Sequence, residues 1–271
     1  MNSVTHIRDI NDPRISIYRS LKVRDLKKEG VFIAESERVV TEMLKRDFKV
    51  ISCLATKNAY GRLKRHLRFV NAPIFIGKKN DLKNIIGFRF HQGVLVAAEM
   101  PKRLSAEKVL AAMKKDHTLV ALNNVTDPQN VGLITRNAAA FGADAMLIDK
   151  NTCDPFYRKS MRVSVGAAFK LPIAYKITLA PILKWLKKSF NTRIIVTMPV
   201  TGSKDLDDIN LSGNICLVFG NEKEGVDRDV LKVADERVKI PLTRDADSIN
   251  VACASSIFLY EAFAKKTTLR R

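Results

Sequence analysis

Short apolar runs alternate with amphipathic stretches through the first hundred residues, which is the pattern of a small α/β fold. The apolar runs predict strands at residues 31–35, 50–56, 73–77 and 93–100. Helical spacing between them predicts helices at residues 36–47, about 60–70 and 80–87. Ahead of the first strand, residues 17–30 alternate charged and apolar positions, which predicts a basic helix that ends at Gly30.

The second half repeats this alternation with more strongly apolar strands. Strands are predicted at residues 118–125, 145–149, 193–200, 214–220 and 237–242. Helices are predicted at residues 130–142, 156–165, 181–190 and 248–266. Parallel strands that helices cover on both faces have this apolar character, so we predict a mostly parallel α/β sheet.

A basic segment of helical pattern that begins at Pro101 separates the two halves. The expected organisation is a first domain over residues 1–100, a junction helix over 101–116 and a second domain over 117–271. A length of 271 residues suits two domains, and 46% apolar residues are enough to form packed cores.

Composition argues against several classes of protein. No apolar run approaches the roughly 18 residues that span a bilayer, and the first residues lack the apolar centre of a secretory signal. The four cysteines are scattered without a CxxC pair, which argues against a disulfide framework or a zinc site. We therefore expect a cytoplasmic protein without a bound metal.

Positive charge is concentrated in the first half of the chain. Residues 1–115 hold 25 basic and 11 acidic side chains, a net charge of +14, whereas residues 116–271 hold 22 and 17, a net charge of +5. This skew is typical of a surface that binds a polyanion, although a generally basic soluble protein would also show it. A membrane surface fits less well because no single amphipathic helix collects the charge. Nucleic acid is therefore the favoured partner.

Three polar turns follow strands of the second half, at the edge where open α/β sheets bind their ligands. The first turn, in residues 123–143, starts a helix at Asp127 and Pro128 and carries Asn130 and Arg136. Asn130 and Arg136 lie about 600° apart around a helix, so they can contact the same group only if Asn130 lies at the N-terminus of the helix. A capped surface helix would explain the same spacing.

The second turn lies in VFGNEKEGV, where a buried strand ends in glycine and the carboxylates Glu222 and Glu224 follow. These carboxylates either bind a ribose or base, or simply solvate the turn. The third turn precedes a long apolar helix, with Ser248 as its expected N-cap and Asn250 two residues further on. A serine in this position can also bind a ligand at the helix N-terminus.

The order and spacing of the three turns are specific: N-x5-R, then G-x-E-x-x-G, then IP-x6-S-x-N-V. With these motifs, residues 118–262 resemble the SpoU-type family of RNA 2′-O-ribose methyltransferases, within the SPOUT superfamily. Residues 1–100 resemble more loosely the ribosomal-protein-like substrate-binding domain that many members carry. That second likeness rests on the segment from Asp12 to Val40 and on HQGVLVAA.

The resemblance implies a parallel α/β sheet with a deep trefoil knot, S-adenosylmethionine bound in that knot, and a homodimer formed through the C-terminal domain. It places the cofactor contacts at Thr197, Gly220, Ile240 and Ser248. The register of Thr197 against Met198 stays open.

The resemblance also implies which residues are catalytic. We expect Arg136 to orient and polarise the hydroxyl rather than remove its proton, because arginine stays protonated in proteins. Asn130 and Glu222 are expected to position that arginine or the ribose, and Asn250 to brace the site. His91 is expected to be structural or to contact RNA.

Two other functions fit parts of the sequence. A non-catalytic RNA-binding protein would use the same basic half, but it would not need the three turns. A dinucleotide-dependent enzyme would need a glycine-rich turn after its first strand, where ALNNVTDPQN has none. For the methyltransferase, the expected partner is RNA, with ribosomal RNA favoured over transfer RNA by the ribosomal-protein-like domain.

Overall fold

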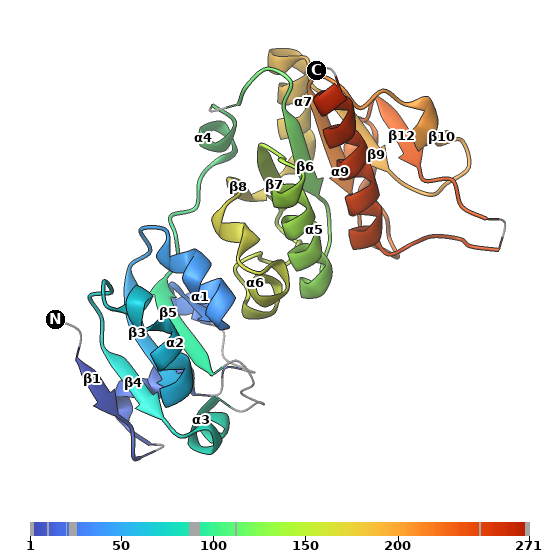
Figure 1. The fold of residues 1–271 in the computed structure, drawn as a ribbon. Coiled ribbons are helices and arrows are strands. Elements are labelled where there is room, and N and C mark those ends of the chain that lie inside the picture. Colours follow the sequence, from blue (N-terminus) through green and yellow to red (C-terminus); the bar gives the residue numbers. More distant parts are fainter. Residues whose placement is uncertain are drawn as a thin grey trace. The chain divides into compact units, whose positions relative to one another are not determined.

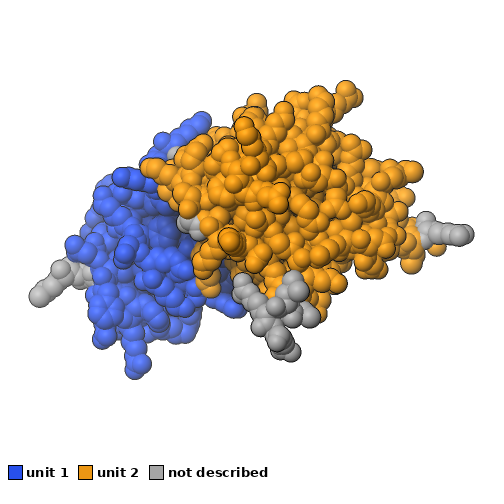
Figure 2. Space-filling model, turned by 90° about the horizontal axis from the view of Figure 1, so that it is seen from above, with its two compact units in different colours: residues 1–102, 156–169 blue, residues 103–155, 170–271 orange. Residues whose placement is uncertain are grey.

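The computed structural model describes residues 3–9, 11–19, 21, 26–86, 93–111, 113–243 and 245–268. The chain divides into two compact units, which Figure 2 distinguishes by colour. The N-terminal unit comprises residues 1–102 together with 156–169, and the C-terminal unit comprises 103–155 with 170–271. A segment of the second half therefore belongs to the N-terminal unit.

The N-terminal unit is built on a five-stranded sheet with the order β1-β4-β3-β5-β2, in which β5 is antiparallel to its neighbours. Its strands are β1 (Val4–His6), β2 (Val31–Glu35), β3 (Val50–Thr56), β4 (Ile74–Gly77) and β5 (Val94–Glu99). Its α-helices are α1 (Glu37–Leu44), α2 (Lys57–Leu67), α3 (Lys79–Ile86) and α6 (Arg158–Ser164). The strands and helices predicted between residues 31 and 100 are thus confirmed, while β1 was not predicted.

The basic helix predicted over residues 17–30 is wrong. The described part of this region forms two short 3-10 helices, η1 (Pro13–Tyr18) and η2 (Leu26–Glu29), and Arg19 between them is extended. Tyr18 is fully buried; its hydroxyl lies 2.8 Å from the Ser52 hydroxyl and accepts a hydrogen bond from the Ala97 amide. Tertiary burial of the ring therefore overrides the helical pattern.

Residues 156–169 complete the core of the N-terminal unit. The rings of Phe32, Phe48, Phe156 and Phe169 form one cluster, with centroids 5.0–6.4 Å apart. The segment contains α6 and the 3-10 helix η3 (Ala167–Phe169). The region predicted as a helix at 156–165 is confirmed as a helix, but its packing joins it to strands that lie more than a hundred residues earlier.

The C-terminal unit contains a seven-stranded sheet with the order β10-β12-β9-β11-β6-β7-β8, and all of these strand pairs are parallel (Figure 1). Its strands are β6 (Thr118–Leu122), β7 (Ala145–Asp149), β8 (Ile173–Ile177), β9 (Arg193–Thr197), β10 (Lys204–Asp205), β11 (Ile215–Phe219) and β12 (Glu236–Lys239). The predicted parallel α/β sheet is confirmed, although β8 and β10 were not predicted.

Helices cover both faces of this sheet. They are α4 (Ala106–Leu110), α5 (Pro128–Ala140), α7 (Leu179–Phe190), α8 (Arg228–Leu231) and α9 (Val251–Thr268), together with the 3-10 helix η4 (Leu206–Asp208). Residues of α4, α7 and α8 share one buried cluster with one face of the strands. Helices α5 and α9 pack side by side (Figure 1). Phe258 of α9 contacts Phe219 of β11.

The junction helix predicted over residues 101–116 is wrong in extent, because among the described residues of this segment the helix covers only Ala106–Leu110. Leu104 instead forms an isolated parallel bridge with Ala174 of β8. Ser105 then caps α4 by accepting a hydrogen bond from the Lys108 amide. Pairing with the sheet edge thus replaces the first turns of the expected helix. Within the described residues, no helix is long and apolar enough to span a membrane.

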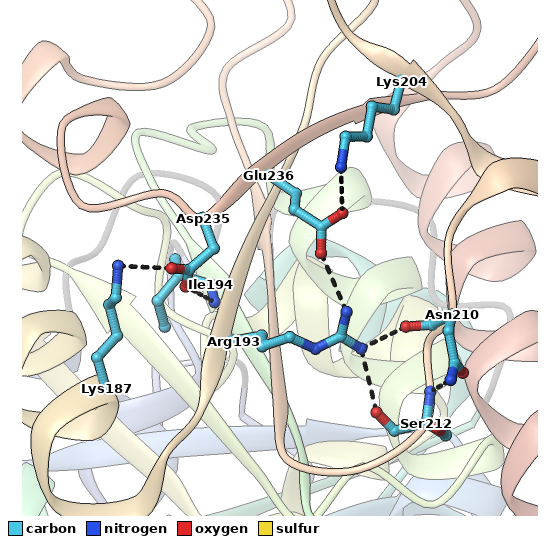
Figure 3. Close-up of polar contacts among 8 residues, drawn as sticks. All are labelled: Lys187, Arg193, Ile194, Lys204, Asn210, Ser212, Asp235 and Glu236. Atoms are coloured by element: carbon cyan, nitrogen blue, oxygen red, sulfur yellow. Dashed lines mark hydrogen bonds and ion pairs between the residues drawn. The ribbon is translucent and has the colours of Figure 1, made fainter.

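Polar contacts fasten β12 beside β9 (Figure 3). The Arg193 guanidinium donates to the Glu236 carboxylate at 3.0 Å and to the carbonyl oxygens of Asn210 and Ser212. One residue earlier, Asp235 accepts a hydrogen bond from the Ile194 amide and pairs with Lys187. These contacts fix the register of β12, and with it the position of the loop that follows this strand.

Candidate functional site

A cavity of about 360 Å³ lies at the carboxyl ends of β9, β11 and β12 and at the start of α9. Parallel α/β sheets bind ligands at this edge, and the volume lies in the range of small-molecule sites. The four residues predicted to contact a cofactor all line it: Thr197, Gly220, Ile240 and Ser248. Met198 lines the cavity as well, and the Thr197 hydroxyl is already engaged, since it donates to the Val218 carbonyl oxygen.

Gly220 directly follows β11, at a position where only a glycine fits. A Cβ atom on this residue would lie 2.6 Å from both the Gly225 carbonyl oxygen and a methyl carbon of Val226. The close approach closes a tight loop, in which Asn221 and Gly225 exchange backbone hydrogen bonds of 2.9 and 3.0 Å. Gly225 adopts a φ of +72°, which a residue with a side chain rarely does. The G-x-E-x-x-G spacing therefore encodes the shape of this loop.

The side chain of Asn221 stabilises this loop by hydrogen bonds, a role that the sequence did not predict. Its side-chain oxygen accepts hydrogen bonds from the Lys223 and Glu224 amides at 2.8 and 3.1 Å. Its side-chain nitrogen donates to the Asn124 carbonyl oxygen at 2.9 Å. Asn221 thus links the loop after β11 to the loop after β6.

A buried polar network continues from there. The Asn123 side-chain nitrogen donates to Asp149 at 2.8 Å and to Asp227 at 2.9 Å, and its oxygen accepts from the Asp227 amide. Asn123 and Asp149 are 1% and 5% exposed, so water does not replace these bonds. The adjacent polar residues Asn123 and Asn124 directly after an apolar strand are the feature that could have identified this network.

The three predicted turns meet at Asn130. This residue lies in the first turn of α5, where Asp127 caps the helix by accepting hydrogen bonds from the Gln129 and Asn130 amides. The Asn130 side-chain nitrogen donates to the Glu222 carboxylate. Its side-chain oxygen accepts from the Asn250 amide group at 3.0 Å. Glu222 also lines the cavity, so this polar junction adjoins it.

The N-cap predicted for the long C-terminal helix is wrong by two residues. Asn250, rather than Ser248, caps α9, because its side-chain oxygen accepts hydrogen bonds from the Ala252 and Cys253 amides at 2.8 and 3.4 Å. Asn250 therefore caps α9 with its side-chain oxygen, while its side-chain nitrogen donates to the Asn130 side-chain oxygen. Ser248 remains on the cavity wall.

Arg136 does not join this junction. It is exposed on α5, and within the described part of the chain its side chain forms no hydrogen bond or ion pair with the residues of the junction. The next residue, Asn137, faces α9 and donates to the Ala252 carbonyl oxygen and the Ser255 hydroxyl, both at 3.0 Å. His91 lies outside the described residues.

The cysteines are all free, and two of them are buried. Burial raises the pKa of the Cys53 thiol to about 12 and also raises that of Cys216. Both thiols are therefore protonated at neutral pH and belong to the core.

Comparison with known proteins places these features in one family. The model of the "SpoU rRNA Methylase family" matches residues 117–260. An uncharacterized tRNA/rRNA methyltransferase of Mycobacterium bovis is 32% identical over 266 residues, which cover 95% of this chain and 91% of the relative. The 23S rRNA (guanosine-2′-O-)-methyltransferase RlmB of Acinetobacter baylyi is 32% identical over 187 residues, or 68% of this chain and 75% of the relative.

Solved structures share the fold along nearly the whole chain. The AdoMet-bound rRNA methyltransferase of Sinorhizobium meliloti has a TM-score of 0.82 at 24% identity, covering 96% of this chain and 97% of that chain. The SpoU methyltransferase AviRb of Streptomyces viridochromogenes, in complex with AdoMet, has a TM-score of 0.82 at 23% identity, covering 95% and 100%.

The resemblance drawn from the three turns is thus confirmed, and with it the enzyme class and the cofactor. Neither the non-catalytic alternative nor the dinucleotide-dependent one is needed. The chain belongs to the SpoU rRNA methylase family, a family of RNA 2′-O-ribose methyltransferases that use S-adenosylmethionine.

Proposed function

We propose that this protein methylates a ribose 2′-hydroxyl in structured RNA, with ribosomal RNA favoured over transfer RNA. The observation that carries the proposal is the junction of Asn130, Glu222 and Asn250 beside the cavity lined by Gly220 and Ser248. Three motifs that are distant in sequence meet where a cofactor and a hydroxyl would have to be brought together.

The cavity suits S-adenosylmethionine in size and in chemistry. When bound, this cofactor supplies a methyl group on a positively charged sulfonium. The walls combine apolar side chains such as Leu231 and Phe258 with the carboxylates of Glu222 and Glu224. Apolar surface would pack against the adenosine part, and carboxylates favour a nearby positive charge. We assign cofactor contacts to Thr197, Gly220, Ile240 and Ser248, in the trefoil knot expected from the family.

Arg136 is the residue we assign to the hydroxyl. A guanidinium stays charged, so it can pair with the phosphate next to the target ribose and stabilise negative charge that develops on the oxygen. Asn130 and Glu222 would orient the ribose, and Asn250 would brace both through its bond to Asn130. Alignment of the hydroxyl with the methyl group contributes the rest of the rate enhancement.

We further propose a homodimer formed through α5 and α9. These helices expose large apolar side chains, namely Leu133, Ile257, Tyr260 and Phe263, at 37–55% of their surface. A group of exposed apolar side chains on neighbouring helices is typical of a protein interface. Arg136 lies on the same helix α5 and is exposed, which favours a role at the partner's cavity.

The N-terminal unit is proposed to bind the RNA. Its residues, 1–102 and 156–169, hold 24 basic and 10 acidic side chains, a net charge of +14 that favours contact with phosphates. The likeness to a 23S rRNA methyltransferase favours ribosomal RNA as the substrate. The free thiols Cys53, Cys153, Cys216 and Cys253 are consistent with a cytoplasmic enzyme.

The test is methyl-labelled S-adenosylmethionine with total cellular RNA, followed by mapping of 2′-O-methyl positions. We expect label at a ribose oxygen of a ribosomal RNA. Arg136→Lys is expected to lose most turnover while binding the cofactor normally, because lysine lacks the planar guanidinium. Label confined to a base atom, or found only in transfer RNA, would contradict the corresponding part of the proposal.

A further inference from the structure

Phe69 is the most exposed large apolar side chain of the described residues, at 77%. It lies in the N-terminal unit, two residues beyond the end of α2. The Arg68 guanidinium carbon lies 4.4 Å from the centroid of the ring. This contact holds a cation against the aromatic ring and leaves most of the ring open to solvent.

The ring borders a groove of about 600 Å³. One side is the loop between α1 and β3, and the other is the end of α2 with the chain that follows it. Four cationic side chains line the groove, against one carboxylate, that of Asp47. The cations are Lys45, Arg46, Lys49 and Arg65.

Two of these cations are engaged and two are available. Lys45 pairs with Glu42 at 2.6 Å, and Lys49 pairs with Glu99 at 2.5 Å. Arg46 and Arg65 have no carboxylate partner within the described part of the chain. The groove therefore presents two guanidinium groups whose charge is not neutralised by an ion pair there.

Structural roles account for much of this region but not for Phe69. Basic side chains in the last turn of α2 suit the helix macrodipole, which explains Lys64, Arg65 and His66. Phe48, which also lines the groove, belongs to the buried aromatic cluster. Phe69 gains neither burial nor a helix-dipole interaction.

We propose that this groove binds a single-stranded segment of the RNA substrate, with an unpaired base stacked on Phe69 and flanking phosphates at Arg46 and Arg65. The proposal rests on the proposed function, which supplies RNA as the ligand. Aromatic rings beside cationic grooves bind single-stranded RNA in this way, because every base has a face that can stack. A duplex would not offer such a face.

The test measures binding of a labelled single-stranded RNA of about twelve nucleotides to the full chain. Phe69→Ala and Phe69→Leu should both weaken binding about tenfold, because leucine is apolar but cannot stack. Phe69→Trp should retain affinity. Thermal unfolding should be unchanged in all three, since the ring is exposed.

Charge is tested separately with Arg46→Gln. We expect weaker binding and a log–log salt dependence whose slope falls by about 1, as for the loss of one phosphate contact. Lys188→Gln, a change on α7 in the C-terminal unit, makes the same change in net charge and should leave affinity and slope nearly unchanged.

Three outcomes would overturn the inference: wild-type affinity in Phe69→Ala, a loss in Phe69→Ala that Phe69→Leu restores, or an altered sedimentation mass with unaltered RNA affinity. The last would identify Phe69 as a contact to a second copy of this chain. Methylation by the wild type separates this test from the proposed function. If the wild type methylates RNA and the Phe69 variants bind it normally, only the groove is wrong; if the wild type methylates no RNA, the proposed function fails.

Discussion

The side chain of Asn130 is bonded on both sides: its nitrogen donates to Glu222, and its oxygen accepts from Asn250 at 3.0 Å. A side-chain amide has a donor nitrogen and an acceptor oxygen, so it can donate to a carboxylate and accept from a second amide at once. The two hydrogen bonds fix the side-chain orientation of Asn130 and link the N-terminus of α5 to the N-terminus of α9. Each of the three sequence turns contributes one member.

Replacing Asn130 tests whether this junction supports catalysis. Asn130→Asp would place a second carboxylate against Glu222, and we expect the maximal rate of methyl transfer to fall roughly 10- to 100-fold. Cofactor affinity should change little, because Asn130 does not line the cavity. The neighbouring exposed residue Gln129 provides the control, since Gln129→Ala should keep normal activity. Equal activity of the two variants would exclude a role for the junction.

Two glycines allow a matched comparison. Gly220→Ala would force a Cβ atom to within 2.6 Å of the Gly225 carbonyl oxygen. We therefore expect the free energy of unfolding to fall by about 1–3 kcal/mol and cofactor binding to weaken at least tenfold. Gly61 lies in α2 with open space where a Cβ atom would stand, and Gly61→Ala should stabilise the protein by about 0.5–1 kcal/mol. Calorimetry and cofactor titration measure both; a Gly220→Ala variant with normal affinity would contradict the loop geometry.

The ion pair between Glu35 and Arg158 tests the attachment of residues 156–169 to the N-terminal unit. Glu35 is 3% exposed and accepts a 2.5 Å hydrogen bond from Arg158. Glu35→Ala leaves the Arg158 guanidinium, which is 21% exposed, without this carboxylate, and we expect a loss of about 1–3 kcal/mol in the free energy of unfolding. The exposed pair of Glu37 and Arg62 is the control, with a cost of about 0–1 kcal/mol for Glu37→Ala. Urea denaturation distinguishes the two, and similar losses would refute the burial argument.

The proposed dimer is tested at Tyr260. This residue is 55% exposed on α9, and its ring lies 6.1 Å from that of Phe141. Tyr260→Asp would bury a charge in the interface, so we expect sedimentation to show a monomer and methylation to fall if Arg136 acts at the partner's cavity. Tyr157→Asp, at an exposed aromatic residue of the N-terminal unit, should leave the mass unchanged. A wild-type protein that sediments as a monomer would contradict the proposal directly.

His117 makes stability depend on pH. Its ring nitrogens lie 3.0 Å from the Lys114 carbonyl oxygen and 2.8 Å from the Thr192 hydroxyl, and burial lowers its pKa below the usual value near 6.5. Because the pKa is lowered in the folded protein, the unfolded chain takes up the proton at a higher pH than the folded chain does. The neutral, buried His117 therefore adds its full contribution to the free energy of unfolding above the pKa of the unfolded state. This contribution declines as the pH falls through that pKa and below it. Denaturation midpoints at about pH 5 and pH 7.5 should differ less in His117→Gln than in the wild type; an equal difference would exclude this source.

Apolar periodicity and helix caps act over a few residues, so the residues alone predicted most strands and most helices; the strands β1, β8 and β10 were not predicted. The sequence also determined the family, through the spacing of Asn130 and Arg136, of Gly220 and Glu222, and of Ser248 within its motif. The charge of the first half, which local structure does not affect, could likewise be obtained from the residues alone.

Which segments lie side by side depends on the tertiary structure. Burial of Tyr18 replaced the helix expected at 17–30, and the aromatic cluster placed residues 156–169 in the N-terminal unit. The two side-chain hydrogen bonds of Asn130 likewise depend on how distant segments pack. So does the exposure of Phe69 beside Arg46 and Arg65. Local patterns cannot specify such contacts, because their free energy comes from burial and hydrogen bonds that exist only once the chain has folded.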